Sequence, residues 1–197
     1  MQNFLPFISY AVIASFTPGP NNIMSLSCGV KYGYKIALRF ILGVTSGFVI
    51  IMLASAYLNI MLYNILPKIK VLMYIFGSLY MLYLAYNMIK PRSSKKLATD
   101  YSVCSFKNGM VLQFINPKAI LYGITITSSF IIPYYTANIV LISFSVALAL
   151  LAFIATSSWA LFGSIFQKFI AKYNKAFNIV MALLLLYCAV TLILEIF

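Results

Sequence analysis

Two short motifs combine helix-breaking residues with side chains that can bind a small polar molecule. The first is the run Thr17-Pro18-Gly19-Pro20-Asn21-Asn22, and the second is Gln113 followed by Asn116-Pro117-Lys118. Proline removes helical hydrogen bonds, and within a lipid bilayer the freed N–H and C=O groups must face protein or a water-filled cavity. The candidate substrate-binding residues are therefore Pro18, Gly19, Pro20, Asn21, Asn22, Gln113, Asn116, Pro117 and Lys118.

Each polar side chain at these breaks also has a structural alternative. Lys118 lies roughly ten residues into an apolar segment, or about 15 Å at 1.5 Å per residue, which is farther than a lysine reaches comfortably to the surface. It either binds a substrate carboxylate or maintains the geometry of the broken helix. The amides of Asn21 and Asn116 either contact substrate or satisfy backbone groups that the prolines leave free.

The residue types that are missing limit the chemistry. The chain has no histidine, and its only two carboxylates are Asp100 and Glu195. General acid–base catalysis and hard-metal binding both need such groups converging at one site. No serine is well placed to pair with Lys118 as a nucleophile. We therefore expect neither an enzyme nor a metal ion or other cofactor.

Composition indicates what must position the two motifs. Hydrophobic residues make up 63% of the 197 residues, charged residues make up 8%, and the mean hydropathy is +1.00. This predicts an all-α integral membrane protein, because about 20 apolar residues are needed to cross the hydrocarbon. The chain has room for six transmembrane helices, expected near residues 4–27, 37–62, 67–89, 108–132, 138–165 and 175–197.

Basic residues predict the orientation. The net charge is +12, and eleven of the 14 Lys and Arg residues fall in or next to three connections, residues 28–36, 90–107 and 166–174. Only Lys68 and Lys70 belong to the other side. The positive-inside rule then places the three basic connections in the cytoplasm and both termini outside. We expect the lipid bilayer and a small molecule as partners, not nucleic acid, and a homo-oligomer stays open.

The polar stretch 90–107 divides one transporter domain, residues 1–197, into halves 1–89 and 108–197. Each half has three predicted spans, so the halves must lie in opposite orientations. This predicts two inverted three-helix repeats with broken helices 1 and 4, in which both breaks lie at similar depth in the cytoplasmic half of the membrane.

Cysteines and glycines suggest structural roles only. Cys28, Cys104 and Cys188 are odd in number and scattered, so we expect no disulfide framework and no metal site. Gly43 and Gly47 have the spacing that permits close helix approach in a membrane.

The motifs together resemble those of the LysE/RhtB amino-acid exporters. The resemblance rests on residues 17–22, on Gly43-x-x-x-Gly47 with Leu42, and on Gln113-Phe114-x-Asn116-Pro117-Lys118. Within that superfamily, residues 20–23, 47–48, 120–123 and 178–185 look most like the exporters of cysteine and O-acetylserine. Many relatives carry an aspartate where this chain has Phe48, a departure that disfavours cationic substrates such as lysine.

The resemblance implies export of small neutral amino acids across the bacterial inner membrane, driven by the proton gradient, without a cofactor. Three alternatives stay open: a passive amino-acid channel, an exporter of another amino acid such as homoserine or threonine, and an enzyme or assembly factor. Collapse of the proton gradient separates an exporter from a channel, because only uphill efflux depends on it.

Overall fold

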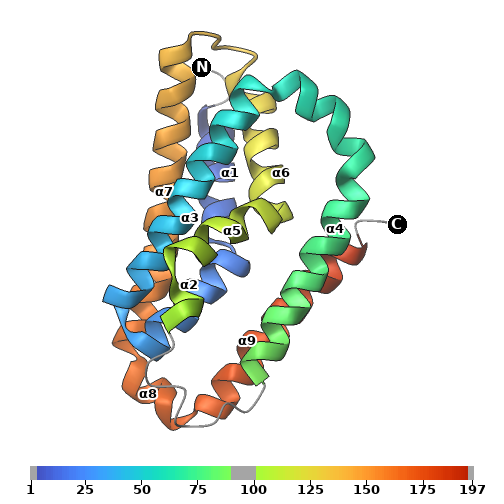
Figure 1. Cartoon of the computed structure of the whole chain (residues 1–197). Coiled ribbons are helices and arrows are strands. Elements are labelled where there is room, and N and C mark those ends of the chain that lie inside the picture. The colour runs from blue at the N-terminus through green and yellow to red at the C-terminus, as the bar shows by residue number, and fades with distance from the viewer. Residues whose placement is uncertain (1–3, 90–100, 195–197) are drawn as a thin grey trace.

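The computed structural model describes residues 4–89 and 101–194, and over these residues the chain forms helices and no strands (Figure 1). The all-α prediction is thereby confirmed. The elements are α1 (Phe4–Phe16), α2 (Pro20–Tyr32), α3 (Tyr34–Tyr57), α4 (Asn59–Ile89), the 3-10 helix η1 (Tyr101–Cys104), α5 (Phe106–Ile115), α6 (Pro117–Ile126), the π-helical turn η2 (Thr127–Ile131), α7 (Asn138–Ile165), α8 (Gln167–Lys172) and α9 (Asn174–Leu194).

Four of the described helices are long and apolar enough to cross a membrane. The apolar windows are Tyr34–Tyr57, Val71–Ile89, Asn138–Ile165 and Asn174–Thr191. The 13-residue helices α1 and α2 and the 10-residue helices α5 and α6 are too short to cross alone. They are consecutive pairs, however, and each pair is interrupted at a predicted break. The chain is therefore a multi-pass membrane protein in which two segments are broken.

Proline sets the start of the second helix in each pair. Pro20 and Pro117 occupy the first turns of α2 and α6, where the missing N–H is not needed. Before them, Gly19 is fully extended, with φ −173° and ψ 174°, and Asn116 is extended with φ −85° and ψ 101°. The first break thus spans residues 17–19, and at the second break Asn116 alone separates α5 from α6.

Glycines allow the helices around the breaks to pack closely. A side chain on Gly43 of α3 would overlap the backbone carbonyl of Phe106 in α5, and one on Gly109 would overlap that of Phe40. A side chain on Gly47 would come within 2.9 Å of Cγ of Gln113. The prediction that Gly43 and Gly47 permit close approach is confirmed. The helices α2 and α7 cross in the same way, through Gly29 and Gly163.

Two buried clusters lie on either side of the breaks. One contains Ile23, Phe40 and Leu112 from α2, α3 and α5, and the other contains Met52 and Ile126 from α3 and α6. The helices α4 and α9 pack mainly on each other and run beside this bundle, as Figure 1 shows. Their outer faces are rich in exposed large apolar side chains, as expected for surfaces that contact lipid.

The α2–α3 turn and α8 lie at one end of the molecule, and the α3–α4 and η2–α7 connections lie at the other (Figure 1). We call the first of these the basic end. It carries Lys31, Lys35, Arg39, Lys107, Lys168, Lys172 and Lys175, all of them exposed or partly exposed. Residues 90–100, which include Asp100 and most of the predicted basic loop, fall outside the described residues, as do Glu195 and both chain ends.

Three predicted boundaries are wrong. Residues 28–36 are not a loop, because α2 continues to Tyr32 and α3 begins at Tyr34. Gly33 alone makes the turn, with a φ of +77° that favours glycine. The second span was expected to end at residue 62 and the third to start at 67, but α3 ends at Tyr57 and α4 begins at Asn59. Residues 166–174 contain α8, since Ile170 packs against the core while Lys168 and Lys172 stay exposed.

The expectation of no disulfide is also wrong. Cys28 of α2 and Cys104 of η1 are bonded, with Cα atoms 5.9 Å apart, while Cys188 is free. Their spacing did not indicate a pair, because 76 residues separate the two cysteines and only the packing of η1 against α2 brings them together.

Candidate functional site

The end of α1 exposes carbonyl groups that lack a helical N–H partner, and side chains of α2 and α7 supply the donors. The amide Nδ2 of Asn22 donates to the carbonyl oxygens of Ser15 and Thr17, both over 2.9 Å. The indole Nε1 of Trp159 donates to the carbonyl oxygen of Phe16 over 3.3 Å. Asn22 therefore has a structural role at the break, and its side chain is almost fully buried.

Lys118 completes this arrangement from the second break. Its ammonium Nζ donates to the carbonyl oxygen of Thr17 over 3.0 Å and lies 3.5 Å from that of Pro18. A Cβ on Gly19 would come within 3.3 Å of Cδ and Nζ of Lys118, so glycine leaves room for the lysine to cross the break. The positive charge is thus held against backbone carbonyls and is still partly exposed.

The start of α2 presents backbone donors. Gly19 has no side chain to cap the first turn, and Pro20 has no N–H. The N–H groups of Asn21 and Asn22 therefore receive no cap from the preceding residue, and they lie at the positive end of the helix dipole. Such a helix start favours a carboxylate.

Asn116 joins the two breaks. Its side-chain Oδ1 accepts a hydrogen bond from the backbone N–H of Lys118 over 3.1 Å, which caps α6. Its Nδ2 donates to Oδ1 of Asn21 over 3.3 Å. The two breaks therefore lie next to each other in the bundle, while their depth in a membrane stays a prediction.

Two adjoining cavities lie at the breaks. The smaller, of about 50 Å³, is lined by Ala14, Ser15, Gly19, Pro20, Asn21, Asn22, Val44, Phe48, Asn116, Lys118, Ala119, Tyr122, Ala152 and Thr156. The larger, of about 430 Å³, shares Ala14, Gly19, Pro20, Lys118 and Tyr122 with it and extends to α4 and α9. The first has space for little more than water, so a small solute at the breaks would occupy the junction of the two.

The nine predicted residues fall into two groups. Gly19, Pro20, Asn21, Asn22, Asn116 and Lys118 line the smaller cavity, and Pro18 lines the larger. The other two face neighbouring helices: Gln113 lies beside Gly47 of α3, and Pro117 lies beside Gly77 of α4. Gln113 is fully buried, and neither its Oε1 nor its Nε2 has a hydrogen-bond partner.

Tyr122 is a cavity residue that the motifs did not reveal. Its ring stacks on Tyr10 with centroids 5.7 Å apart and lies 5.4 Å from the ring of Phe48. It lines both cavities, and its buried hydroxyl has no hydrogen-bond partner. Its position one helical turn after Lys118 was the available signal, because residues four apart share a helix face.

The site can bind charges of both signs without a titratable acid or a metal. Backbone N–H groups and the Lys118 ammonium suit a carboxylate, while the carbonyl oxygens of Thr17 and Pro18 suit an ammonium group. Among the described residues no cluster of metal ligands occurs. The arrangement fits a small zwitterion.

Comparison with known proteins identifies the family. A model of the LysE type translocators matches residues 12–196. The chain belongs to the LysE family. The resemblance drawn from its motifs is thereby confirmed, and the family is one of translocators.

Named relatives of this LysE-family chain are efflux proteins. The cysteine/O-acetylserine efflux protein of Escherichia coli strain K12 is 38% identical over 184 residues, which cover 93% of this chain and 94% of that protein. Proteins of the same name from Escherichia coli O139:H28 and Shigella flexneri serotype 5b match with the same identity and coverage. No solved structure matches the chain at a significant level.

Proposed function

We propose that this chain exports small neutral amino acids, foremost cysteine and O-acetylserine, from the bacterial cytoplasm through the inner membrane. The observation that carries the proposal is the meeting of the two broken segments at Asn21 and Asn116, 3.3 Å apart, in a chain of the LysE family. Half-helices that meet at a cavity are a recurrent substrate site of secondary transporters. The names of the relatives supply the substrate class.

The substrate carboxylate binds the N–H groups that open α2, with Lys118 as the nearby positive charge. Its ammonium group binds carbonyl oxygens at the end of α1, among them those of Thr17 and Pro18, for which Lys118 is the present donor. Substrate and lysine therefore compete for the same acceptors. Binding of substrate therefore displaces the Lys118 ammonium from these carbonyl oxygens, and no cofactor is needed for this change.

A neutral side chain is favoured by the walls of the site. The side chain of Phe48 packs on Tyr122, with ring centroids 5.4 Å apart. Val44, Ala119 and Ala152 add further apolar surface. A cationic side chain such as that of lysine would lose its hydration here without gaining a negative partner, which is costly.

We further propose six transmembrane spans, of which α1–α2 and α5–α6 are the broken ones, with the basic end in the cytoplasm and both termini outside. Near the basic end, α2 packs extensively on α7 and α5 packs extensively on α3. In an inverted repeat their counterparts are α6 on α3 and α1 on α7, and these pairs pack far less. This inequality supports a conformation closed towards the basic end.

Counterflow tests the function directly. Purified protein in proteoliposomes loaded with unlabelled cysteine should take up labelled cysteine and O-acetylserine, take up threonine more slowly, and not take up lysine. Failure with all four amino acids would contradict the proposal. In cells, a protonophore should abolish uphill export and leave downhill exchange intact; export unaffected by the protonophore would instead identify a passive channel.

A further inference from the structure

The disulfide between Cys28 and Cys104 joins the two half-helices that lead from the basic end to the breaks. Cys28 lies within α2, which starts at Pro20, and Cys104 directly precedes Ser105, the N-cap of α5. At their other ends, α2 and α5 meet through the hydrogen bond between Asn21 and Asn116. The two half-helices are therefore connected at both ends, and only the connection at the basic end is covalent.

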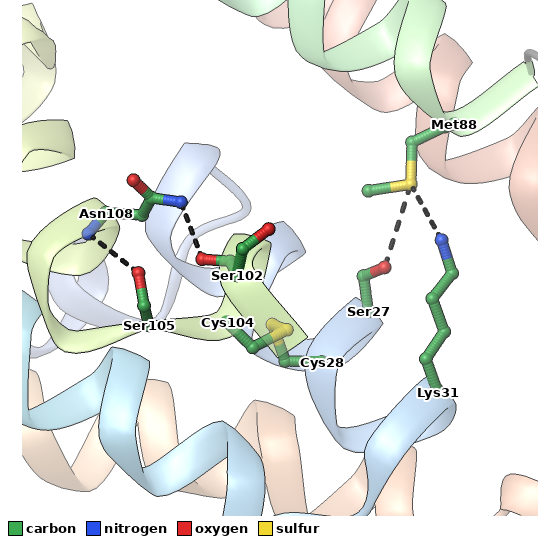
Figure 2. The surroundings of a disulfide bond; sticks show 8 residues. All are labelled: Ser27, Cys28, Lys31, Met88, Ser102, Cys104, Ser105 and Asn108. Atoms are coloured by element: carbon green, nitrogen blue, oxygen red, sulfur yellow. Dashed lines mark hydrogen bonds between the residues drawn. A yellow bond between two sulfur atoms is a disulfide. The ribbon is translucent and has the colours of Figure 1, made fainter. Parts of the chain in front are cut away.

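A cavity of about 240 Å³ adjoins the disulfide and is lined by both cysteines. Figure 2 shows the bond between the Ser27–Lys31 face of α2 and the Ser102–Ser105 segment, with Met88 of α4 across the space. Ser27 Oγ and Lys31 Nζ point to the Met88 sulfur, at 3.6 Å and 3.9 Å. The cysteine side chains are almost fully buried, so this cavity is the route by which a small reagent reaches them.

In the proposed orientation this bond lies on the cytoplasmic side, where thiols are kept reduced and disulfides are mostly transient or redox-sensing. We propose that Cys28 and Cys104 form a thiol–disulfide exchange site that holds the exporter closed towards the cytoplasm when oxidised and releases it when reduced. The gating part of this proposal rests on the proposed transport function.

The reaction partner is a low-molecular-weight disulfide, RS–SR, small enough for the cavity. One cysteine thiolate attacks it, forms a mixed disulfide and releases one RS⁻. The second cysteine thiolate then attacks the protein sulfur of that mixed disulfide and releases the second RS⁻. Two electrons pass from the protein to the small disulfide, and the two protons lost by the cysteine thiols are available to the two RS⁻. A small dithiol reverses the reaction.

The mechanical consequence follows from the packing. The breaks can become accessible from the basic end in two ways. Either α2 separates from η1 and α5, or α3 and α7 move relative to the linked pair of α2 and α5. A bond between Cys28 and Cys104 forbids the first of these movements. Oxidation therefore removes one of the two ways of opening, and the bonded pair is seen here in the arrangement in which α2 packs on α7 and α5 packs on α3.

The test uses the full chain in proteoliposomes and labelled O-acetylserine, which has no thiol of its own. One sample is reduced with dithiothreitol and one is oxidised with cystine, and both reagents are removed before counterflow. A maleimide of high mass, added after denaturation, should attach three times to the reduced protein and once, at Cys188, to the oxidised protein. Counterflow should fall at least about tenfold on oxidation and return with dithiothreitol.

Variants separate this effect from others. Cys28→Ser and Cys104→Ser should transport at the same rate after either treatment, with Cys28→Ala and Cys104→Ala as substitutes if the serine forms do not fold. Cys188→Ser should keep the wild-type ratio between reduced and oxidised rates. In growing cells, acid-trapped protein should carry the reduced pair and become oxidised after treatment with the thiol oxidant diamide.

Three results would overturn the proposal. These are equal counterflow before and after oxidation, loss of counterflow on oxidation in the Cys28 and Cys104 variants as well, and a pair that is fully oxidised in untreated cells. Absence of any counterflow from the reduced protein would instead overturn the proposed function and the gating role with it. The maleimide count alone still decides whether the cysteines exchange.

Discussion

The side-chain amide of Asn116 donates to the side-chain oxygen of Asn21 over 3.3 Å, across 95 residues of sequence. Each asparagine stands at a point where a helix is interrupted, and each interruption by itself would leave polar backbone groups exposed to an apolar environment. Their contact makes one polar site out of two breaks. Because one asparagine comes from each half of the chain, a movement of either half changes the geometry of this site.

Asn21 and its neighbour Asn22 should respond differently to truncation. Asn22→Ala removes the donor to the carbonyl oxygens of Ser15 and Thr17 and should lower stability by about 1–3 kcal/mol, because two partly buried hydrogen bonds are lost. Asn21→Ala should leave the melting temperature in detergent nearly unchanged and reduce counterflow severalfold. Equal destabilisation by both variants would assign Asn21 a purely structural role.

Asn116→Ala should combine both effects. It removes the cap on the N–H of Lys118, at a cost of about 1 kcal/mol, and the donor to Asn21. Asn116→Asp keeps the capping oxygen and loses the donor, so it should regain stability and stay slow in counterflow. Melting temperatures and counterflow rates of the two variants check this; full activity of the aspartate form would show that the contact with Asn21 is dispensable.

Lys118 should be needed for coupling and not only for structure. Lys118→Met removes the donor to Thr17 and the positive charge, and should abolish counterflow. Lys118→Arg keeps a charge but cannot release a proton at accessible pH. If Lys118 exchanges a proton during the cycle, this variant should exchange substrate yet fail to accumulate it against a gradient. Lys35→Met, an exposed change at the basic end, is the control; uphill export by Lys118→Arg at the wild-type rate would refute the hypothesis.

The close crossing of α3 and α5 should be intolerant of added volume. Gly43→Val places a side chain on the carbonyl of Phe106, where backbone and not a flexible side chain would have to shift. We expect a loss of about 1–3 kcal/mol or more in stability, together with lower yield from the membrane. Leu42→Val changes an exposed neighbour on the same helix and should be near neutral. A normal melting temperature for Gly43→Val would show that the crossing is looser than described.

Orientation can be read from single cysteines in a chain whose three native cysteines are replaced by alanine. Lys172→Cys lies at the basic end, and Thr136→Cys lies in the exposed connection before α7 at the opposite end. A membrane-impermeant maleimide should label the cysteine at 136 in intact cells and the cysteine at 172 only after the cells are opened. The reverse pattern would invert the topology and place the Cys28–Cys104 pair outside, where disulfides persist.

Some features followed from local chemistry, and so the sequence predicted them. Pro20 and Pro117 cannot continue a helix, so both breaks fell at the expected residues. The sequence analysis missed helix boundaries that depend on the conformation of one residue or on contacts with distant parts of the chain. Gly33 turns the chain in a single residue, and residues 167–172 form a helix because Ile170 finds a place in the core. A pattern of apolar and basic residues cannot distinguish such a helix from a loop.

By itself, the sequence determined that this chain is a helical membrane protein with two interrupted segments, since composition, periodicity and proline act locally. The combination of its two motifs also indicated the family. Only the tertiary structure decided that Lys118 reaches the carbonyls of the other break, that Tyr122 lines the cavities while Gln113 does not, and that Cys28 meets Cys104. These relationships join residues that are far apart in the chain, so they depend on how the helices pack, and glycines at the crossings allow that packing to be close.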